Sequence, residues 1–179
     1  ANIWMLKKAG VKKILAVNAV GSINDKFPPE NIVIPDQIID YSWGREHTFY
    51  AEELTRVVHI DFTFPYSISL RQTIIRAAKN KQMNLEENAV YGCTQGPRLE
   101  SAAEVKRLSR DGCDLIGMTG MPEASLAREL SVDYASISVV ANWAAGINGN
   151  EISMEQIDYH LQKGMEKVKQ LITETVRIS

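Results

Sequence analysis

The chain has 179 residues, of which 45% are hydrophobic, so it can bury one core but is too short for two typical domains to be expected. Its formal net charge is −2 and its basic residues are scattered, which argues against nucleic acid or another polyanion as a partner. No apolar stretch approaches the ~20 residues needed to cross a bilayer, and Cys93 and Cys113 lack the spacing of metal ligands. We therefore expect a cytoplasmic protein with free thiols, no metal and no membrane partner.

The first residues of the chain already look helical. Residues 1–10 end at Gly10, a common C-terminal stop, and no initiator Met precedes them. We therefore expect residues 1–179 to form one domain that lacks its N-terminal portion. Residues 14–17 then form a short, branched apolar run, as expected for a buried strand.

The rest of the chain alternates between strand-like and helix-like segments. A second strand is predicted at residues 31–40, where Pro35 marks an edge or a bulge. The aromatic-rich residues 41–66 lack a steady period, which indicates an ordered surface excursion. Further on, the pattern predicts helices at residues 67–83, 101–112, 121–130 and 152–176, and strands at residues 88–96, 113–118 and 132–142. The predicted fold class is α/β, a single domain with a central mixed sheet flanked by helices.

Three sequence blocks carry a family resemblance that covers nearly the whole chain. The first is ILAVNAVGSI, the second combines CTQGPRLESAAE with GCDLIGMTGMPEASLARE, and the third is YASISVVANWAAG. In this order and at this spacing they resemble the motifs of the purine nucleoside and methylthioadenosine phosphorylases. The resemblance implies a nucleoside phosphorylase-like fold, a pentosyltransferase activity, inorganic phosphate as co-substrate and no other cofactor.

The first block leaves two interpretations open when it is taken alone. It could be a plain strand-to-turn transition, or the small residues Ala19 and Gly21 could let backbone N–H groups approach an anion. The resemblance implies that a turn at Asn18 and Ala19 and the hydroxyl of Thr119 hold phosphate, and that Met118 lies under the ribose. Thr119 could also be a helix-start residue, and a buried core Met is the common alternative for Met118.

The resemblance assigns purine recognition to two polar residues. Asn142 would be the catalytic residue, donating an amide N–H to purine N7 or O6 as the base departs. Glu100 would accept the N1–H of a 6-oxopurine. Without the resemblance, Asn142 could cap its own turn and Glu100 could be an ordinary acid in the first turn of a helix. The remaining base contacts that the resemblance implies are Ala19, Val20, Gly21 and Leu99, the last standing where the family generally has Phe.

Apolar residues near the end of the chain bear on the 5' end of the nucleoside. Met154 and Ile157 fall near family positions that line the 5' pocket, where an apolar surface suits a methylthio group. They could equally be the inward face of an amphipathic helix. His59 resembles a His that the methylthio branch sends into a neighbouring subunit's 5' pocket, although a lone loop His is usually only solvated. The resemblance therefore implies a homotrimer with sites near its interfaces.

Departures from the family pattern bear on the choice of substrate. Ala141 stands where Ser or Thr is usual, and Ala144 replaces an Asp of the methylthioadenosine enzymes, so both changes move away from adenine. The family's N-terminal phosphate loop and Arg–His pair are not in this sequence. We therefore predict phosphorolysis of a 5'-methylthio-purine nucleoside, preferably methylthioinosine, to free purine and 5-methylthioribose 1-phosphate in purine salvage. The alternatives are a general purine nucleoside phosphorylase, a methylthioadenosine phosphorylase, or a catalytically incomplete purine-binding assembly fragment.

Overall fold

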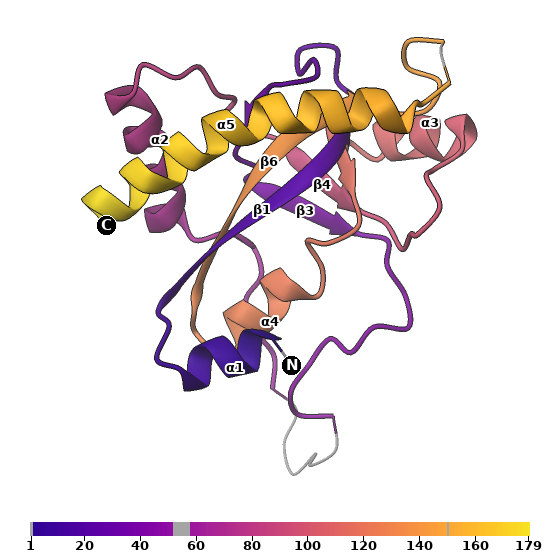
Figure 1. Cartoon of the computed structure of the whole chain (residues 1–179). Helices are drawn as coiled ribbons and strands as arrows, with labels where there is room; N and C mark the ends of the chain where they lie inside the picture. The colour runs from indigo at the N-terminus through magenta and orange to yellow at the C-terminus, as the bar shows by residue number, and fades with distance from the viewer. Residues whose placement is uncertain (1, 52–57, 150) are drawn as a thin grey trace.

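A computed structural model describes residues 2–51, 58–149 and 151–179. In this part of the chain helices and strands alternate, as predicted for an α/β fold (Figure 1). The strands are β1 (Lys13–Ser22), β2 (Ile32–Val33), β3 (Gln37–Asp40), β4 (Val90–Cys93), β5 (Leu115–Gly117) and β6 (Asp133–Trp143). The helices are α1 (Asn2–Lys8), α2 (Ile68–Asn80), α3 (Ala102–Arg110), α4 (Glu123–Glu129) and α5 (Met154–Ile178).

The described strands form one mixed six-stranded sheet in the order β2-β6-β1-β5-β4-β3. β1 runs parallel to β6, and β4 runs parallel to both β3 and β5. The β1–β5 and β2–β6 pairs are antiparallel. The sheet therefore consists of two parallel groups that join where β1 meets β5, which confirms the predicted central mixed sheet.

The junction between β1 and β5 is short and leaves one edge of β1 open. The two strands pair only through Gly21 and Ser22 of β1. Along residues 13–20, no described strand pairs with β1 on the side opposite β6. The carbonyl of Lys12 bonds to the β6 side, and successive residues of a strand direct their backbone groups to alternate edges. Ala19, an odd number of residues further on, therefore directs its N–H to the open edge.

Two strand predictions need correction. The strand predicted at residues 31–40 is two strands, because Pro35 has no N–H and interrupts the ladder. Its first half, β2, pairs with β6, whereas its second half, β3, pairs with β4 at the other side of the sheet. The strand predicted at residues 14–17 continues well beyond residue 17. Asn18 and Ala19 thus lie inside β1, and the predicted turn at these two residues is wrong.

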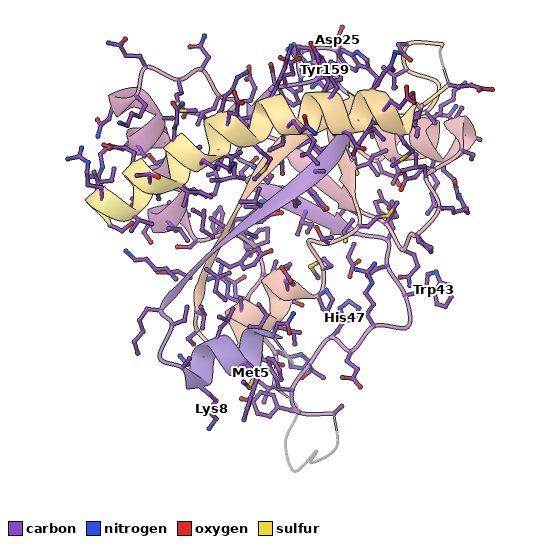
Figure 2. All side chains as sticks on the ribbon, viewed as in Figure 1. Met5, Lys8, Asp25, Trp43, His47 and Tyr159 are labelled. Carbon is purple, nitrogen blue, oxygen red and sulfur yellow. The ribbon has the colours of Figure 1, made fainter. Side chains whose placement is uncertain are left out.

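The predicted surface excursion at residues 41–66 has no helix or strand in its described parts, residues 41–51 and 58–66. Residues 52–57 of this segment lie outside the description. Figure 2 labels Trp43 and His47 on the stretch that follows β3, and the Trp43 side chain is 72% exposed. This segment therefore leaves large aromatic surface uncovered.

The longest helix, α5, packs along β6 and against α2 (Figure 1). Side chains of a strand alternate between its two faces, and in β6 the buried Ala135, Ile137 and Val139 face α2 and α5. α5 comes close at this point because residue 164 is glycine, where a Cβ would lie 2.3 Å from Val139 Cγ1. Val140, on the other face, joins α4 in a second core. Packing on both faces fixes the course of β6 up to its end.

Candidate functional site

A cavity of about 600 Å³ lies where the open edge of β1 meets the ends of β5 and β6. Its wall also includes the loop before α3 and the start of α5, so segments far apart in sequence meet here. The predicted site residues that line it are Asn18, Ala19, Val20, Gly21, Leu99, Glu100, Met118, Thr119, Asn142, Met154 and Ile157. The fold therefore gathers in one place all the residues that the resemblance had assigned to phosphate, ribose and base, and two of the three assigned to the 5' group.

His59 is the predicted site residue that does not line this cavity. Its side chain is exposed, and it follows the part of the loop that lies outside the description. The resemblance placed His59 in the pocket of a neighbouring subunit rather than in that of its own chain. Its position away from the cavity is compatible with that role, which stays a prediction.

Asn18 contributes to the cavity wall, but its side-chain oxygen is already occupied. Asn18 Oδ1 accepts from the hydroxyl of Ser138 at 2.8 Å and from that of Ser136 at 3.3 Å, and the residue is buried. Ala19, by contrast, is exposed in the cavity, and its N–H lies on the open edge of β1. An anion binds hydrogen-bond donors, so at this edge it would meet the backbone N–H of Ala19, whereas the Asn18 side-chain oxygen is an acceptor and cannot bind it.

Asn142 lies near the end of β6, opposite Gly21 of β1. The register shifts just before this pair, since Val20 pairs with Val140 but Gly21 pairs with Asn142, and such a bulge re-aims the side chains beside it. The Asn142 amide nitrogen donates to the carbonyl oxygen of Trp143 at 2.7 Å. Because an amide nitrogen carries two N–H groups, this bond orients the amide while the second N–H can donate to a ligand.

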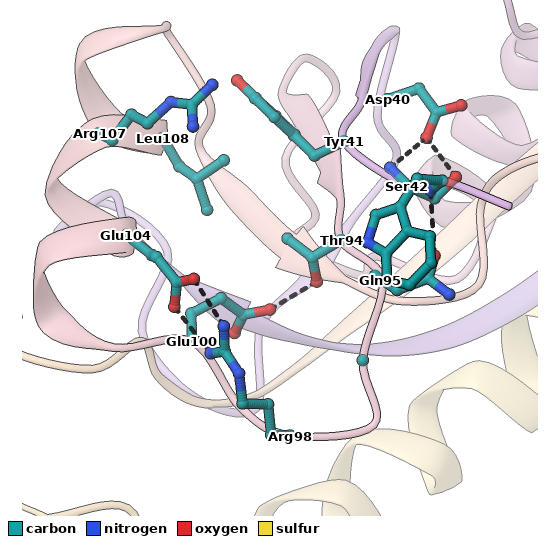
Figure 3. Close-up of a pocket in the computed structure, with 12 residues that line it drawn as sticks. Asp40, Tyr41, Ser42, Thr94, Gln95, Arg98, Glu100, Glu104, Arg107 and Leu108 are labelled. Atoms are coloured by element: carbon teal, nitrogen blue, oxygen red, sulfur yellow. Dashed lines mark hydrogen bonds and ion pairs between the residues drawn. The ribbon is translucent and has the colours of Figure 1, made fainter.

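Glu100 is held by a hydrogen bond that no sequence motif predicts. The hydroxyl of Thr94 donates to Glu100 Oε1 at 2.5 Å (Figure 3). Thr94 directly follows β4, and its own N–H donates to the carbonyl of Gly117 in β5 at 2.8 Å. The hydroxyl is thus presented from a fixed point of the sheet. No regular spacing links a Thr at a strand end to a Glu in the next loop, so the sequence carried no signal for this pair.

The far end of the same loop is fastened to the start of α3. The Ser101 hydroxyl accepts from the Glu104 N–H, and the Glu104 carboxylate accepts from the Ser101 N–H, which makes a capping box. Arg98 donates to both Glu104 oxygens at 2.8 Å (Figure 3). The Arg98 bond is the largest cause that lowers the pKa of Glu104 to about 2, and the backbone bond from Ser101 adds to it. The loop that carries Glu100 is therefore held at both ends.

Arg45, which no sequence motif indicated, ties together two loops that contribute to the cavity wall. Its guanidinium donates at 3.2, 3.0 and 3.0 Å to the carbonyl oxygens of Thr94, Gln95 and Met118, and it also donates to that of Met121. A guanidinium can serve several carbonyls at once because its donors form a rigid planar fork. Arg45 belongs to the aromatic-rich segment of residues 41–66, which was predicted to lie on the surface. A charged residue there is expected to point to solvent rather than toward the site loops.

Met118 and Thr119 follow β5 and lie side by side in the cavity wall. The chain opposite turns at Gly96 with φ +65°, a left-handed conformation that suits glycine. A Cβ at Gly96 would lie only 2.4 Å from Met118 Sδ, so the glycine lets the thioether pack against this turn. Thr119 is an exposed residue of this wall.

The start of α5 supplies an apolar part of the wall. Ile152, Met154 and Ile157 line the cavity there. Met154 is 62% exposed, whereas Ile157 is partly buried. Of the two interpretations left open by the sequence, a purely inward core face does not describe Met154, since most of its side chain is uncovered.

Glu123 and Tyr134 also line the cavity, and neither was predicted as a site residue. The Tyr134 hydroxyl donates to Glu123 Oε2 at 3.0 Å. Burial, with the nearby Glu123 carboxylate as the next cause, raises the pKa of Tyr134 well above its usual range. The phenol therefore keeps its proton and remains a donor to Glu123.

Some classes of site are not found in the described part of the chain. Residues 2–51, 58–149 and 151–179 contain no group of three or more His, Cys, Asp or Glu side chains that could hold a metal ion. Within the same residues, no helix has both the length and the apolar character needed to span a membrane. The described wall of the cavity also lacks Lys, Arg and His side chains. An anion in the cavity would therefore meet only neutral donors of these residues.

Sequence comparison places the chain in one family. Residues 1–177 match the model of the Phosphorylase superfamily. Over all 179 residues the chain is 49% identical to a probable S-methyl-5'-thioinosine phosphorylase of Pseudomonas syringae pv. tomato, of which it covers 73%. Over 177 residues, 96% of this chain, it is 42% identical to a 6-oxopurine nucleoside phosphorylase of Pyrococcus furiosus, of which it covers 67%.

The fold has close counterparts among solved structures. A methylthioadenosine phosphorylase from Schistosoma mansoni in complex with adenine superposes with a TM-score of 0.94 at 30% identity. The alignment covers 99% of this chain and 69% of the other. These matches confirm the resemblance carried by the three sequence blocks. The chain therefore belongs to the phosphorylase superfamily, and its α/β fold is that of the nucleoside phosphorylases.

Proposed function

We propose that this protein, a pentosyltransferase, cleaves the N-glycosidic bond of a 5'-methylthio-purine nucleoside with inorganic phosphate. The preferred base is a 6-oxopurine, so the substrate is methylthioinosine and the products are hypoxanthine and 5-methylthioribose 1-phosphate. The reaction recovers the purine for salvage. The relative from Pseudomonas syringae pv. tomato, which carries the name of this activity, aligns with every residue of the chain.

The observation that carries the proposal is the composition of the 600 Å³ cavity. Asn142, with its amide, and Glu100, with its carboxylate, line this cavity together with the apolar Met154 and Ile157. A 6-oxopurine offers an acceptor at O6 and a donor at N1–H, which match an amide N–H and a carboxylate respectively. The apolar wall suits the methylthio group, which makes no strong hydrogen bond.

The proposed mechanism separates charge between the sugar and the base. A phosphate oxygen bonds to C1' of the ribose while the bond from C1' to N9 breaks, and the electron pair of that bond leaves with the purine. Negative charge therefore builds up on N7 and O6, where the second N–H of Asn142 stabilises it more strongly than in the ground state. The purine then takes a proton from solvent. Met118 lies under the ribose in this arrangement.

Phosphate is proposed to bind at the open edge of β1. The supports are the exposed Ala19, whose N–H points to that edge, and Thr119, an exposed hydroxyl-bearing residue of the same cavity wall. Val20, Gly21 and Leu99 complete the contacts to the base. We propose no cofactor besides phosphate, so dialysis against a metal chelator should leave turnover unchanged.

The proposed assembly is a homotrimer in the cytoplasm, in which His59 of one subunit reaches the 5' pocket of the next. The exposed position of His59, outside the cavity of its own chain, supports this arrangement. Light scattering after size-exclusion chromatography measures the assembly mass. A monomer at micromolar concentration would contradict the trimer and, with it, the role of His59.

The activity is tested by measuring phosphate-dependent base release from methylthioinosine, methylthioadenosine and inosine side by side. The expected order of kcat/KM is methylthioinosine first, with the other two lower by roughly tenfold or more. Faster release of adenine would overturn the base assignment. Faster cleavage of inosine would overturn the 5'-pocket assignment and favour the second candidate, a general 6-oxopurine nucleoside phosphorylase, which the similarity to the Pyrococcus furiosus protein supports.

A further inference from the structure

Glu100 contributes to the walls of two cavities. It lines the 600 Å³ cavity described above and also a second one of about 540 Å³, whose wall includes Tyr41, Thr94 and Arg107. A Glu side chain has three rotatable bonds, and here it has open space on both sides. Something must therefore select the direction in which the carboxylate points.

The hydroxyl of Thr94, a residue that lines the second cavity, fixes the direction of the Glu100 carboxylate by a hydrogen bond (Figure 3). It donates to Glu100 Oε1 at 2.5 Å, whereas its distance to the carbonyl oxygen of Gly117 is 3.3 Å. A hydroxyl has one proton, so the shorter contact to the charged acceptor is the stronger one. Among the described residues, none donates a hydrogen bond to the other carboxylate oxygen, Oε2.

The hydroxyl can act in this way because the backbone of Thr94 is itself immobilised. Its N–H donates to Gly117 of β5 at 2.8 Å, and its carbonyl accepts from Arg45 at 3.2 Å. The loop from there to Glu100 is closed by the bonds of Arg98 to Glu104 at 2.8 Å. A donor on so fixed a frame restricts its acceptor rather than following it.

We infer that Thr94 is a specificity-determining positioning residue, which fixes Glu100 through Oε1 so that Oε2 is presented to the N1–H of a 6-oxopurine. The inference rests on the proposed base specificity and deepens it. A 6-aminopurine has a bare acceptor nitrogen at position 1, so a fixed carboxylate repels it while attracting the oxopurine. Orienting Glu100 before the base arrives also removes the loss of side-chain freedom from the binding step.

The test compares binding of hypoxanthine and adenine to the full chain by calorimetry. Thr94→Val keeps the size of the side chain and removes the hydroxyl, and Thr94→Ser restores the hydroxyl. Thr94→Val should weaken hypoxanthine roughly tenfold, which corresponds to ~1.4 kcal/mol, and leave adenine within about twofold. Thr94→Ser should return hypoxanthine affinity to within about threefold of the original chain.

A matched control is Thr173→Val, which removes a hydroxyl that donates to the carbonyl of Lys169 at 2.8 Å on the exposed side of α5. Thr173 lies sixteen residues beyond Ile157, about 24 Å along the helix, so this variant should bind both bases like the original chain. In a Glu100→Ala background, Thr94→Val should have no further effect on hypoxanthine, because the group that it positions is gone.

Three outcomes would overturn the inference. Equal losses for hypoxanthine and adenine would mean that Thr94 only supports the fold, and so would an undiminished effect of Thr94→Val in the Glu100→Ala background. Unchanged hypoxanthine binding in Thr94→Val would show that Glu100 needs no positioning. These results leave the proposed function intact as long as the original chain prefers hypoxanthine. If the original chain binds adenine as tightly as hypoxanthine, the proposed base specificity fails before any variant is compared.

Discussion

The substitution Asn142→Asp tests the proposed chemistry most directly. An aspartate at this position would have two acceptor oxygens and no N–H. It would lose the bond that Asn142 donates to the Trp143 carbonyl at 2.7 Å, and it would set a carboxylate against purine O6. The first effect acts on every substrate alike, because it concerns the protein alone. The second depends on the base, because a 6-aminopurine offers N–H groups where methylthioinosine has O6.

The ratio of two substrates therefore isolates the base contact. Leaving a buried acceptor unpaired costs about 1–3 kcal/mol, and a hydrogen bond between the charged carboxylate and an amino group contributes about 1.5–3 kcal/mol in favour of the aminopurine. Together, about 2.5–6 kcal/mol predicts that the ratio of kcat/KM for methylthioinosine over methylthioadenosine falls by at least roughly 70-fold. The loss of the Trp143 bond cancels in this ratio.

The assay is phosphate-dependent release of hypoxanthine or adenine, followed by chromatography at several substrate concentrations. Asn142→Ala removes the donor without adding an acceptor. The ratio of kcat/KM for methylthioinosine over methylthioadenosine should therefore fall less in Asn142→Ala than in Asn142→Asp. Asn84→Asp makes the same change of charge at an exposed residue and should leave the ratio unaltered. If Asn142→Asp lowers both activities but keeps the ratio within about threefold, the amide does not select the base and the reasoning is refuted.

Three further substitutions test how the site is held. Arg45→Lys should lower the free energy of unfolding in urea by about 1.5–3 kcal/mol, because one ammonium cannot reach all the carbonyls that the guanidinium serves; an unchanged midpoint would contradict the bracing role. Gly164→Ala should destabilise by about 1–3 kcal/mol through the clash with Val139, and Val139→Ala in the same chain should relieve part of that loss. Glu104→Gln removes a carboxylate whose pKa is lowered from 4.5 to about 2 in the folded protein. The contribution of the ionised Glu104 to folding stability is therefore present above pH 4.5 and is lost as the pH falls toward 2. The stability difference between the original chain and this variant should shrink over that range in thermal unfolding, and a difference independent of pH would contradict it.

Sequence patterns predicted the elements well where local chemistry decides them. The helix predicted at residues 101–112 became α3 because its capping box and Gly112 are local signals. The strand predicted at residues 14–17 was too short, because Asn18 interrupted the apolar run. Asn18 is nevertheless inside β1, where the hydroxyls of Ser136 and Ser138 bond its side-chain oxygen. Those partners come from a strand more than a hundred residues away, and no local pattern reveals them.

In the candidate site, sequence motifs likewise reveal the lining residues but not the residues that hold them in place. Sequence motifs named most of the residues that line the cavity, including Glu100 and Asn142, because a family resemblance carries over residue by residue. The resemblance did not name Arg45, which donates to backbone carbonyls of the site loops, or Thr94, which donates to the carboxylate of Glu100. A residue that positions another residue is recognised by its contacts between loops, and these contacts form only when the chain folds.

The two ends of the proposed reaction rest on different kinds of groups in this chain. The purine end has the oriented side chains of Asn142 and Glu100, each fixed by a hydrogen bond. The phosphate end has the backbone of Ala19 and the hydroxyl of Thr119, with the carboxylate of Glu123 in the same described wall and no cation. A charged phosphate needs compensating charge far more than a neutral purine does. Binding of the base and turnover with phosphate therefore measure different halves of the site, and weak turnover alone would not argue against the base assignment.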